Sequence, residues 1–269
     1  MRLSPQADPP AAFHFERNRL NQTYRSPIMV NPIIANYHLK CSQPSDIHRH
    51  LPTLRRYARE CESIAEFGVR GIVSTWAFLS GLLESRAPSK QIICVDIEDI
   101  PEMGDVRKIA QDHGIALKFN CHDSATCSIP PVDLLFIDTW HVYGHLKREL
   151  NWHHQQVRKY IVMHDTESDG ILGESLRNGW DIEAQARKSG YTEAEISCGL
   201  KRAISEFLAE HSEWRLLRNY PYNSGLTVLA RPANVKITVW DRVIAAIQSS
   251  KLCVDLRRLL FRLLGRSPG

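Results

Sequence analysis

The chain of 269 residues has no run of 18 or more apolar residues, so we expect no membrane-spanning helix. Its N-terminal segment lacks an apolar core and does not resemble a secretory signal. The seven cysteines form no Cys-x-x-Cys pair, and several stand inside apolar runs, as Cys94 does in IICVDI. This pattern predicts buried, reduced thiols in a cytoplasmic protein.

The excess of positive charge lies in one tail. The net charge is +4, but residues 235–269 contain seven basic and two acidic residues, which leaves −1 for the rest. The body of the chain therefore has no basic footprint for nucleic acid. The tail, residues 233–269, interleaves arginines with leucines and valines and predicts a basic amphipathic helix. Three partners remain possible for this helix: a membrane surface, its own domain, or a second subunit, which would make the protein a homodimer.

The middle of the chain alternates short apolar segments with helical patterns, and 43% hydrophobic content is enough for a full core. Segments that are apolar throughout are typical of parallel strands covered on both faces. The predicted strands are 63–69, 91–97, 115–120, 132–138 and 160–165. The predicted helices between and before them are 45–62, 73–86, 103–113 and 144–157. The sequence therefore predicts an α/β fold with a mostly parallel sheet.

The segments that flank this α/β core differ in composition. Residues 1–45 have several prolines and no clear element, so we expect an arm that is partly disordered. Polar residues 167–198 predict a helical insertion in the main domain, 46–232. Two closing strands, 214–220 and 226–231, flank Asn223-Ser224-Gly225, which favours a tight turn and an antiparallel C-terminal β-hairpin.

Polar residues stand at the end of each of the five predicted parallel strands. They are Glu66 to Gly68, Asp96, Asn120 to Ser124, Asp138 with His141, and His164 to Thr166. In open α/β sheets, ligands bind outside the carboxyl ends of the strands, where the strand order reverses. Because these side chains would meet at that edge, we expect a ligand site there.

These motifs resemble those of class I S-adenosylmethionine-dependent methyltransferases. The resemblance lies in Glu66-x-Gly68, Asp96, CHDS (121–124), FIDTWHVYGHLKREL (136–150) and YIVMHDT (160–166). Within that group it is closest to small-molecule and sugar O-methyltransferases of the cephalosporin hydroxylase and macrocin type, over roughly 60–231. It implies a Rossmann-like, seven-stranded sheet with helices on both faces and a reversed last strand.

The resemblance also implies a role for each residue on the cofactor side. Glu66 and Gly68 would line the methionine part of S-adenosylmethionine, and Ser74 would approach its carboxylate. Asp96 would hold the ribose hydroxyls, and Asp123 would face the adenine amino group. One departure lies in the glycine loop, where Gly71 precedes the position that is glycine in relatives.

On the acceptor side, the resemblance makes Asp138 and Asp165 the ligands of Mg²⁺ or Mn²⁺ and His141 the general base, with Asp138 also next to the cofactor. His164 stands where relatives often carry an acid, and as a third ligand it would favour Mn²⁺, Fe²⁺ or Zn²⁺. A hydroxyl group is a weak acid, so a cation that polarises it and a neutral imidazole beside it suit O-methylation.

We therefore expect an O-methyltransferase for a hydroxyl of a small molecule, sugar or glycan. Two alternatives stay open: an inactive scaffold or membrane-surface protein that works through its basic tail, and a nucleotide-cofactor oxidoreductase. Against the latter, no Gly-x-Gly-x-x-Gly follows the first strand.

Four other residues have side chains that are common in binding sites. His153 and His154 suggest zinc, but no second pair stands at zinc spacing, so we expect them in surface and loop positions. Trp180 and Tyr191 either line an acceptor pocket or pack within the insertion.

Overall fold

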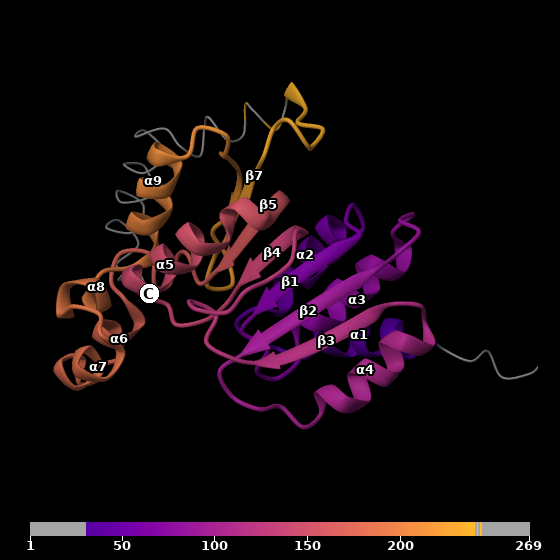
Figure 1. Ribbon diagram of the computed structural model, residues 1–269, viewed down its shortest axis with the longest axis horizontal. Coiled ribbons are helices and arrows are strands. Elements are labelled where there is room, and N and C mark those ends of the chain that lie inside the picture. Colours follow the sequence, from indigo (N-terminus) through magenta and orange to yellow (C-terminus); the bar gives the residue numbers. More distant parts are fainter. Residues whose placement is uncertain (1–30, 240, 242, 244–269) are drawn as a thin grey trace, which may run out of the picture. The chain divides into compact units, whose positions relative to one another are not determined.

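The structure, a computed structural model, describes residues 31–239, 241 and 243 (Figure 1). The chain divides into two units, 1–30 and 31–269, and every described residue belongs to the second. Its helices are α1 (Pro32–Ser42), α2 (Leu51–Ala58), α3 (Ser74–Glu84), α4 (Met103–Asp112), α5 (Tyr143–His153), α6 (Glu174–Arg177), α7 (Ile182–Ser189), α8 (Glu193–Ser197) and α9 (Leu200–Glu210), with 3₁₀ turns η1 (His48–His50) and η2 (His154–Gln156). None of the described helices is long and apolar enough to cross a membrane.

A single seven-stranded sheet runs through this unit. Its strands are β1 (Ser63–Phe67), β2 (Gln91–Asp96), β3 (Ala116–Cys121), β4 (Val132–Ile137), β5 (Val157–His164), β6 (Arg215–Tyr220) and β7 (Leu226–Ala230). The order is β3-β2-β1-β4-β5-β7-β6, and β7 alone runs against its neighbours. The predicted fold class is thereby confirmed, and the strand order reverses between β1 and β4.

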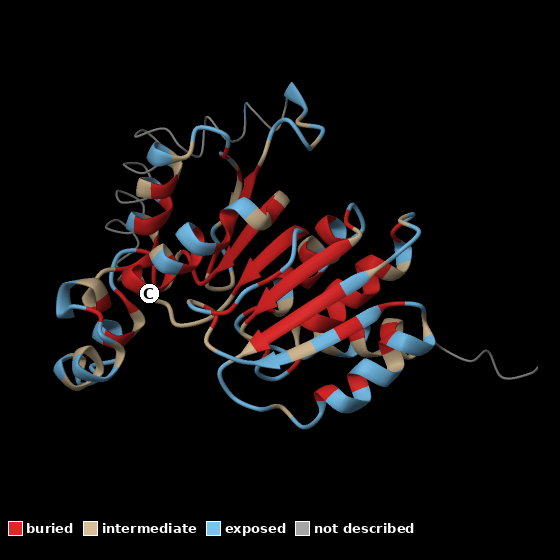
Figure 2. Ribbon diagram, viewed as in Figure 1, coloured by how far each residue is buried: buried red, intermediate tan, exposed pale blue. Residues whose placement is uncertain are grey.

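Helices cover both faces of the sheet, and alternate residues of each central strand face opposite layers. Ile64 of β1 belongs to the core beneath α1 to α4, whereas the next residue, Ala65, belongs to the core beneath α5 and α9. The central strands are buried along their length, whereas the edge strand β3 is mostly exposed (Figure 2). The sheet is thus held rigidly, and its strand ends present side chains from a fixed base.

The structure corrects the prediction for the N-terminal arm at residues 32–42, which form helix α1. Asn31 caps this helix through Ile33 N at 2.9 Å, and Pro32 stands in the first turn, where proline costs nothing. The two buried residues Ile33 and Tyr37 then dock the helix on the core. The apolar positions in this helix are too few to reveal it by periodicity.

The other elements lie close to their predicted ranges, with shifts of a few residues at most in the strands. The helix predicted from residue 45 begins as η1, where the Ser45 hydroxyl accepts from His48 N at 3.1 Å, and continues as α2. The insertion forms α6, α7 and α8, as expected for a helical segment. The basic amphipathic tail lies outside the described residues, apart from positions up to 239, 241 and 243.

The predicted hairpin is confirmed, with β6 and β7 antiparallel. Asn223 and Ser224 both adopt positive φ, +50° and +66°, as a tight turn of this kind requires. The turn packs back on η1, because Arg49 N donates to Asn223 Oδ1 at 2.8 Å and Asn223 Nδ2 donates to Ser45 O at 2.9 Å. The hairpin thus ties the end of the chain to the region before β1.

Candidate functional site

A cavity of about 670 Å³ opens at the carboxyl ends of the strands, at the switch point between β1 and β4. Seven of the residues predicted for the site line it: Gly68, Ser74, Asp96, Asp123, Asp138, His141 and Asp165. Glu66 and His164 are not among its lining residues. The topology therefore brings together side chains from five strand ends, as the sequence predicts.

The loop after β1 depends on glycine at position 68. Gly68 has φ +82°, and a Cβ there would lie 1.8 Å from the backbone oxygen of Asp138. The ends of β1 and β4 are therefore in direct backbone contact. Further along the loop, Ile72 adopts φ +50°, in the left-handed region that favours glycine, at the position where the resemblance implies glycine.

The carboxylate of Asp96 organises this loop from the end of β2. Its Oδ2 accepts from Val69 N at 2.7 Å and from Arg70 N at 3.2 Å, and its Oδ1 accepts from Glu98 N at 3.1 Å. Each carboxylate oxygen has more than one acceptor direction, so Asp96 can also accept from a diol in the cavity. Capping and ligand binding are thus compatible at this residue.

Glu66 lies beneath the cavity rather than in its wall. Its carboxyl group is fully buried, accepts from Ser74 Oγ at 2.6 Å and from Cys94 Sγ at 3.3 Å, and contacts no solvent. Burial raises its pKa to about 7. Glu66 therefore positions Ser74, which lines the cavity at the start of α3.

The far wall holds a cluster of carboxylates and imidazoles around His141. His141 Nε2 lies 3.1 Å from Asp138 Oδ1 and 3.2 Å from Asp165 Oδ2, and its Nδ1 is ion-paired with Glu174. The two aspartates come from the ends of the adjacent strands β4 and β5. Asp165 adopts φ +55°, a sparsely populated conformation for a non-glycine residue, which aims its carboxylate at this cluster.

His164 lies behind the two aspartates and is almost fully buried. Its Nδ1 is 3.3 Å from Asp138 Oδ1 and 3.0 Å from Asp165 Oδ2, and its Nε2 faces Asn223 O at 3.3 Å. Burial opposes a charge on this ring, but the two carboxylates outweigh it and raise the pKa of His164 to about 10. His164 therefore orients the aspartates and balances their charge.

The same electrostatics act on the other members of the cluster. Burial opposes a charge on His141, but Asp138, Glu174 and Asp165 outweigh it and hold its pKa well above the usual range. Burial would raise the pKa of Asp138, yet His164 and His141 outweigh that effect and lower it. The carboxylates thus favour the protonated form of both imidazoles in the protein alone.

The donor set of this cluster fits a divalent cation. One ligand atom each from Asp138, His141 and Asp165 lie within 4.8 Å of one another, and all three residues border the cavity. Two carboxylates and one imidazole suit Mn²⁺ and Fe²⁺ as well as Mg²⁺. The structure places His141 rather than His164 in this group of three.

An aromatic wall stands beside the cluster. Trp140 and Tyr191 both line the cavity, with ring centroids 5.6 Å apart and nearly perpendicular rings. The Tyr191 hydroxyl lies 3.0 Å from His145 Nδ1, and Arg148 stacks 3.8 Å from the centre of the tyrosine ring. Trp180 is 47% exposed and is not among the lining residues, so only Tyr191 of the insertion's two candidates reaches the cavity.

Sequence reasoning missed two acids near the cavity. Glu174 comes from the insertion, where no motif marks it, and it reaches His141 only through the fold. Glu149 is fully buried and accepts from Ser124 Oγ at 2.6 Å and from Thr139 Oγ1 at 2.9 Å. Glu149 Oε1 also lies 3.4 Å from His145 Nε2, and the spacing of one helical turn between these two residues was a usable signal for that contact.

A larger hollow of about 1060 Å³ lies at the opposite, amino edge of the strands. Several of its charged groups are paired, since Arg158 contacts Asp133 and Glu62 at 2.8 and 2.9 Å. It holds none of the predicted site residues, so we place the functional site at the smaller cavity.

The strand order, with β7 reversed beside β5, is the one that the resemblance implies. The chain has the class I methyltransferase fold. No protein-family model matches the chain, and no curated protein matches it.

Solved structures with similar folds include several methyltransferases. An O-methyltransferase for tomaymycin synthesis from Streptomyces achromogenes, in complex with SAM, is 11% identical with a TM-score of 0.45, over 74% of this chain and 89% of that one. An O-methyltransferase from Bacillus cereus, in complex with SAH, is 12% identical with a TM-score of 0.44, over 74% and 90%. The SAH-bound methyltransferase PaMTH1 of Podospora anserina is 16% identical with a TM-score of 0.42, over 73% and 86%. At these values the matches decide nothing about the cofactor, acceptor or site residues of this chain.

Proposed function

We propose that the protein transfers the methyl group of S-adenosylmethionine to a hydroxyl of a small molecule or sugar, assisted by a divalent cation. One observation carries this proposal: a single cavity at the switch point is bordered by Gly68, Ser74 and Asp96 on one side and by Asp138 and His141 on the other. A cofactor and an acceptor can therefore meet in one space, as in-line transfer requires.

The side of the cavity next to β1 and β2 would bind the cofactor. Ser74 at the start of α3, held by Glu66, would meet the amino-acid part, and Asp96 would accept from the ribose diol. Asp123, which caps Ala125 N at 2.8 Å and lines the cavity, would face the adenine. The bound cofactor supplies an electrophilic methyl group on a sulfonium ion.

The acceptor would lie between the cluster and the aromatic wall. Asp138 and Asp165 would hold a divalent cation, which would supply polarisation of the acceptor hydroxyl, and in this proposal His141 stays out of the ligand set and acts as the base. His141 would accept the hydroxyl proton at Nε2, since a cation on the two aspartates would offset the charges that raise the pKa of this imidazole. Glu174, ion-paired with Nδ1, would hold the ring with Nε2 directed at Asp138 and Asp165.

The wall of Trp140 and Tyr191 supports a flat or ring-shaped acceptor, since aromatic faces pack well against the apolar faces of sugars and aromatic rings. Arg148 and Lys188 also border this part of the cavity. We propose that these two groups bind polar or anionic substituents of the acceptor.

The decisive test is calorimetric titration of S-adenosylhomocysteine into the full-length protein, with and without Mn²⁺ or Mg²⁺. We expect micromolar binding, and a loss of about tenfold or more in Asp96→Ala, because two hydrogen bonds to the ribose disappear. Asp112→Ala, an exposed aspartate at the end of α4, is the matched control and should bind like the wild type. Absence of binding in the wild type under both conditions would contradict the proposal.

A further inference from the structure

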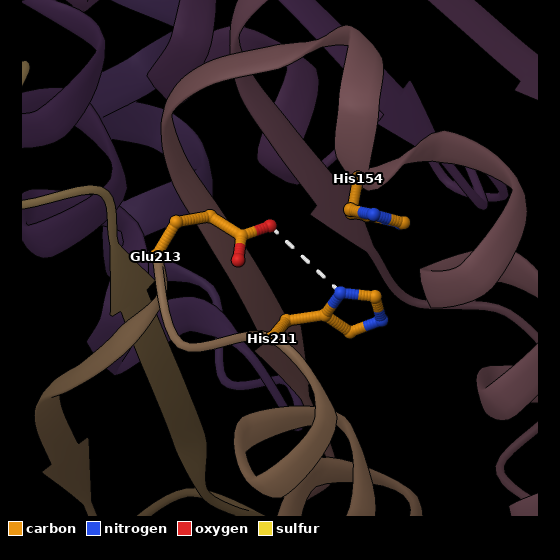
Figure 3. A group of neighbouring side chains, drawn as sticks. All are labelled: His154, His211 and Glu213. Carbon is orange, nitrogen blue, oxygen red and sulfur yellow. Dashed lines mark ion pairs between the residues drawn. The ribbon is translucent and has the colours of Figure 1, made fainter.

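A second cluster of metal-binding side chains lies outside the cavity, formed by His154, His211 and Glu213 (Figure 3). One ligand atom of each lies within 4.8 Å of the others, and the three side chains point toward one another. His154 belongs to η2 just before β5, His211 is the C-cap residue after α9, and Glu213 precedes β6. The tertiary structure thus joins three positions that are up to 59 residues apart in the sequence.

This cluster corrects the expectation that His153 and His154 are surface residues. His153 is buried and its Nε2 lies 2.7 Å from Ser124 O, so it serves the core. His154 is also buried, and its Nδ1 lies 3.0 Å from Leu150 O. A ring that donates Nδ1–H to a backbone carbonyl presents Nε2 as a lone pair, which is the arrangement usual behind metal-bound histidines.

The partners of His154 complete a set of zinc type. The rings of His154 and His211 lie 4.2 Å apart between centroids, and Phe207 packs against both. Glu213 Oε1 lies 3.8 Å from His211 Nδ1, close to the ~3.4 Å that separates two ligands of a tetrahedral ion. His154 is buried, His211 half-buried and Glu213 exposed, so the ion would enter from the solvent side.

We propose that His154, His211 and Glu213 bind a divalent transition-metal ion, with Zn²⁺ the best match to two imidazoles and one carboxylate. The ion would join η2 to the turn between α9 and β6. This point lies at the amino ends of β5 and β6, roughly 25 Å from the cavity for a strand of eight residues.

The test uses full-length protein without a histidine tag, titrated with Co²⁺ as a visible probe of nitrogen-containing sites and then with Zn²⁺ as competitor. We expect the Co²⁺ affinity to fall at least about tenfold in both His211→Gln and Glu213→Gln. Glu210→Gln, which removes an exposed charge at the end of the same helix, is the control and should bind like the wild type. Because Glu213 is exposed, its variant tests the proposal even if the His211 variant does not fold.

Asp138→Asn separates this site from the cluster in the cavity. If Co²⁺ affinity falls only in Asp138→Asn and stays unchanged in Glu213→Gln and His211→Gln, the proposal is wrong. Thermal unfolding provides a second measurement, in which Zn²⁺ at about a hundredfold excess over its Kd should raise the wild-type Tm by roughly 5 °C. An equal rise in Glu213→Gln would also contradict the proposal.

Discussion

At the scale of single residues, Asp138 links the two imidazoles of the cluster, since it contacts both His141 and His164. We expect Asp138→Asn to lower methyl transfer by about 10²–10⁴-fold, because both the cation and the orientation of His141 depend on this carboxylate. Transfer from labelled S-adenosylmethionine to a panel of sugars and phenols measures the effect. Asp112→Asn is the control, and unchanged transfer in Asp138→Asn would remove Asp138 from the proposed site.

Gly68 is a second residue whose role is decided locally. We expect Gly68→Ala to lower the free energy of unfolding by about 2–4 kcal/mol, since alanine resists φ +82° and its Cβ would overlap Asp138 O. Gly104→Ala is the matched control: nothing lies within 4 Å of a Cβ in that helix, so alanine should stabilise by up to about 1 kcal/mol. Urea unfolding with equal effects in both variants would show that the contact between β1 and β4 is not restrictive.

At the scale of elements, the β6–β7 turn connects the hairpin to the η1 region through side-chain hydrogen bonds. Asn223 adopts φ +50° and its side chain bonds Arg49 N and Ser45 O. Asn223→Gly keeps the turn conformation but loses both hydrogen bonds, so we expect a cost of about 1–2 kcal/mol. Asn223→Ala should cost about 1 kcal/mol more, because alanine also disfavours positive φ. If urea unfolding gave the alanine variant a higher free energy of unfolding than the glycine variant, this account would be wrong.

Helix α1 shows how a short element adds to the site without touching a ligand. Its Lys40 ammonium donates to Gly71 O at 3.1 Å, and Ile33 and Tyr37 anchor the helix in the core. The helix thereby supports the loop after β1 at Gly71, next to the backbone groups that Asp96 binds. The sequence pattern did not predict this helix, because only two of its 11 residues are buried and they form no continuous apolar face.

At the scale of the whole molecule, the buried Glu66 makes stability depend on pH. Its pKa rises from 4.5 to about 7 on folding, so the folded protein holds this proton more tightly than the unfolded chain. The contribution is fully present below pH 4.5 and is lost as pH rises through 7. Between those limits we expect the free energy of unfolding of Glu66→Gln to gain on the order of 3 kcal/mol relative to wild type.

Urea unfolding at a series of pH values measures this difference. Glu210→Gln is the control, since its exposed carboxyl should change stability little at any pH. Parallel curves for Glu66→Gln and wild type between pH 4.5 and 7 would show that Glu66 is not protonated preferentially in the folded state. His164, whose pKa rises from 6.5 to about 10, adds a similar loss at higher pH in both proteins.

The sequence by itself determined the order of strands and helices, the hairpin and the polar strand ends. Parallel strands buried on both faces must be apolar throughout, and a turn with two positive φ values favours residues such as Asn223. The carboxyl ends of parallel strands lie at one edge of the sheet, so the sequence alone predicts that Asp96, Asp138 and Asp165 lie in one site.

Only the tertiary structure decided which side chains touch. It moved Glu66 beneath the cavity, brought Glu174 from the insertion onto His141, and joined His154 to His211 and Glu213. Local sequence rules act over one or two helical turns, whereas these contacts join residues separated by tens of positions. Such contacts depend on how helices dock on the sheet, a choice made by the packing of the whole core rather than by any short segment.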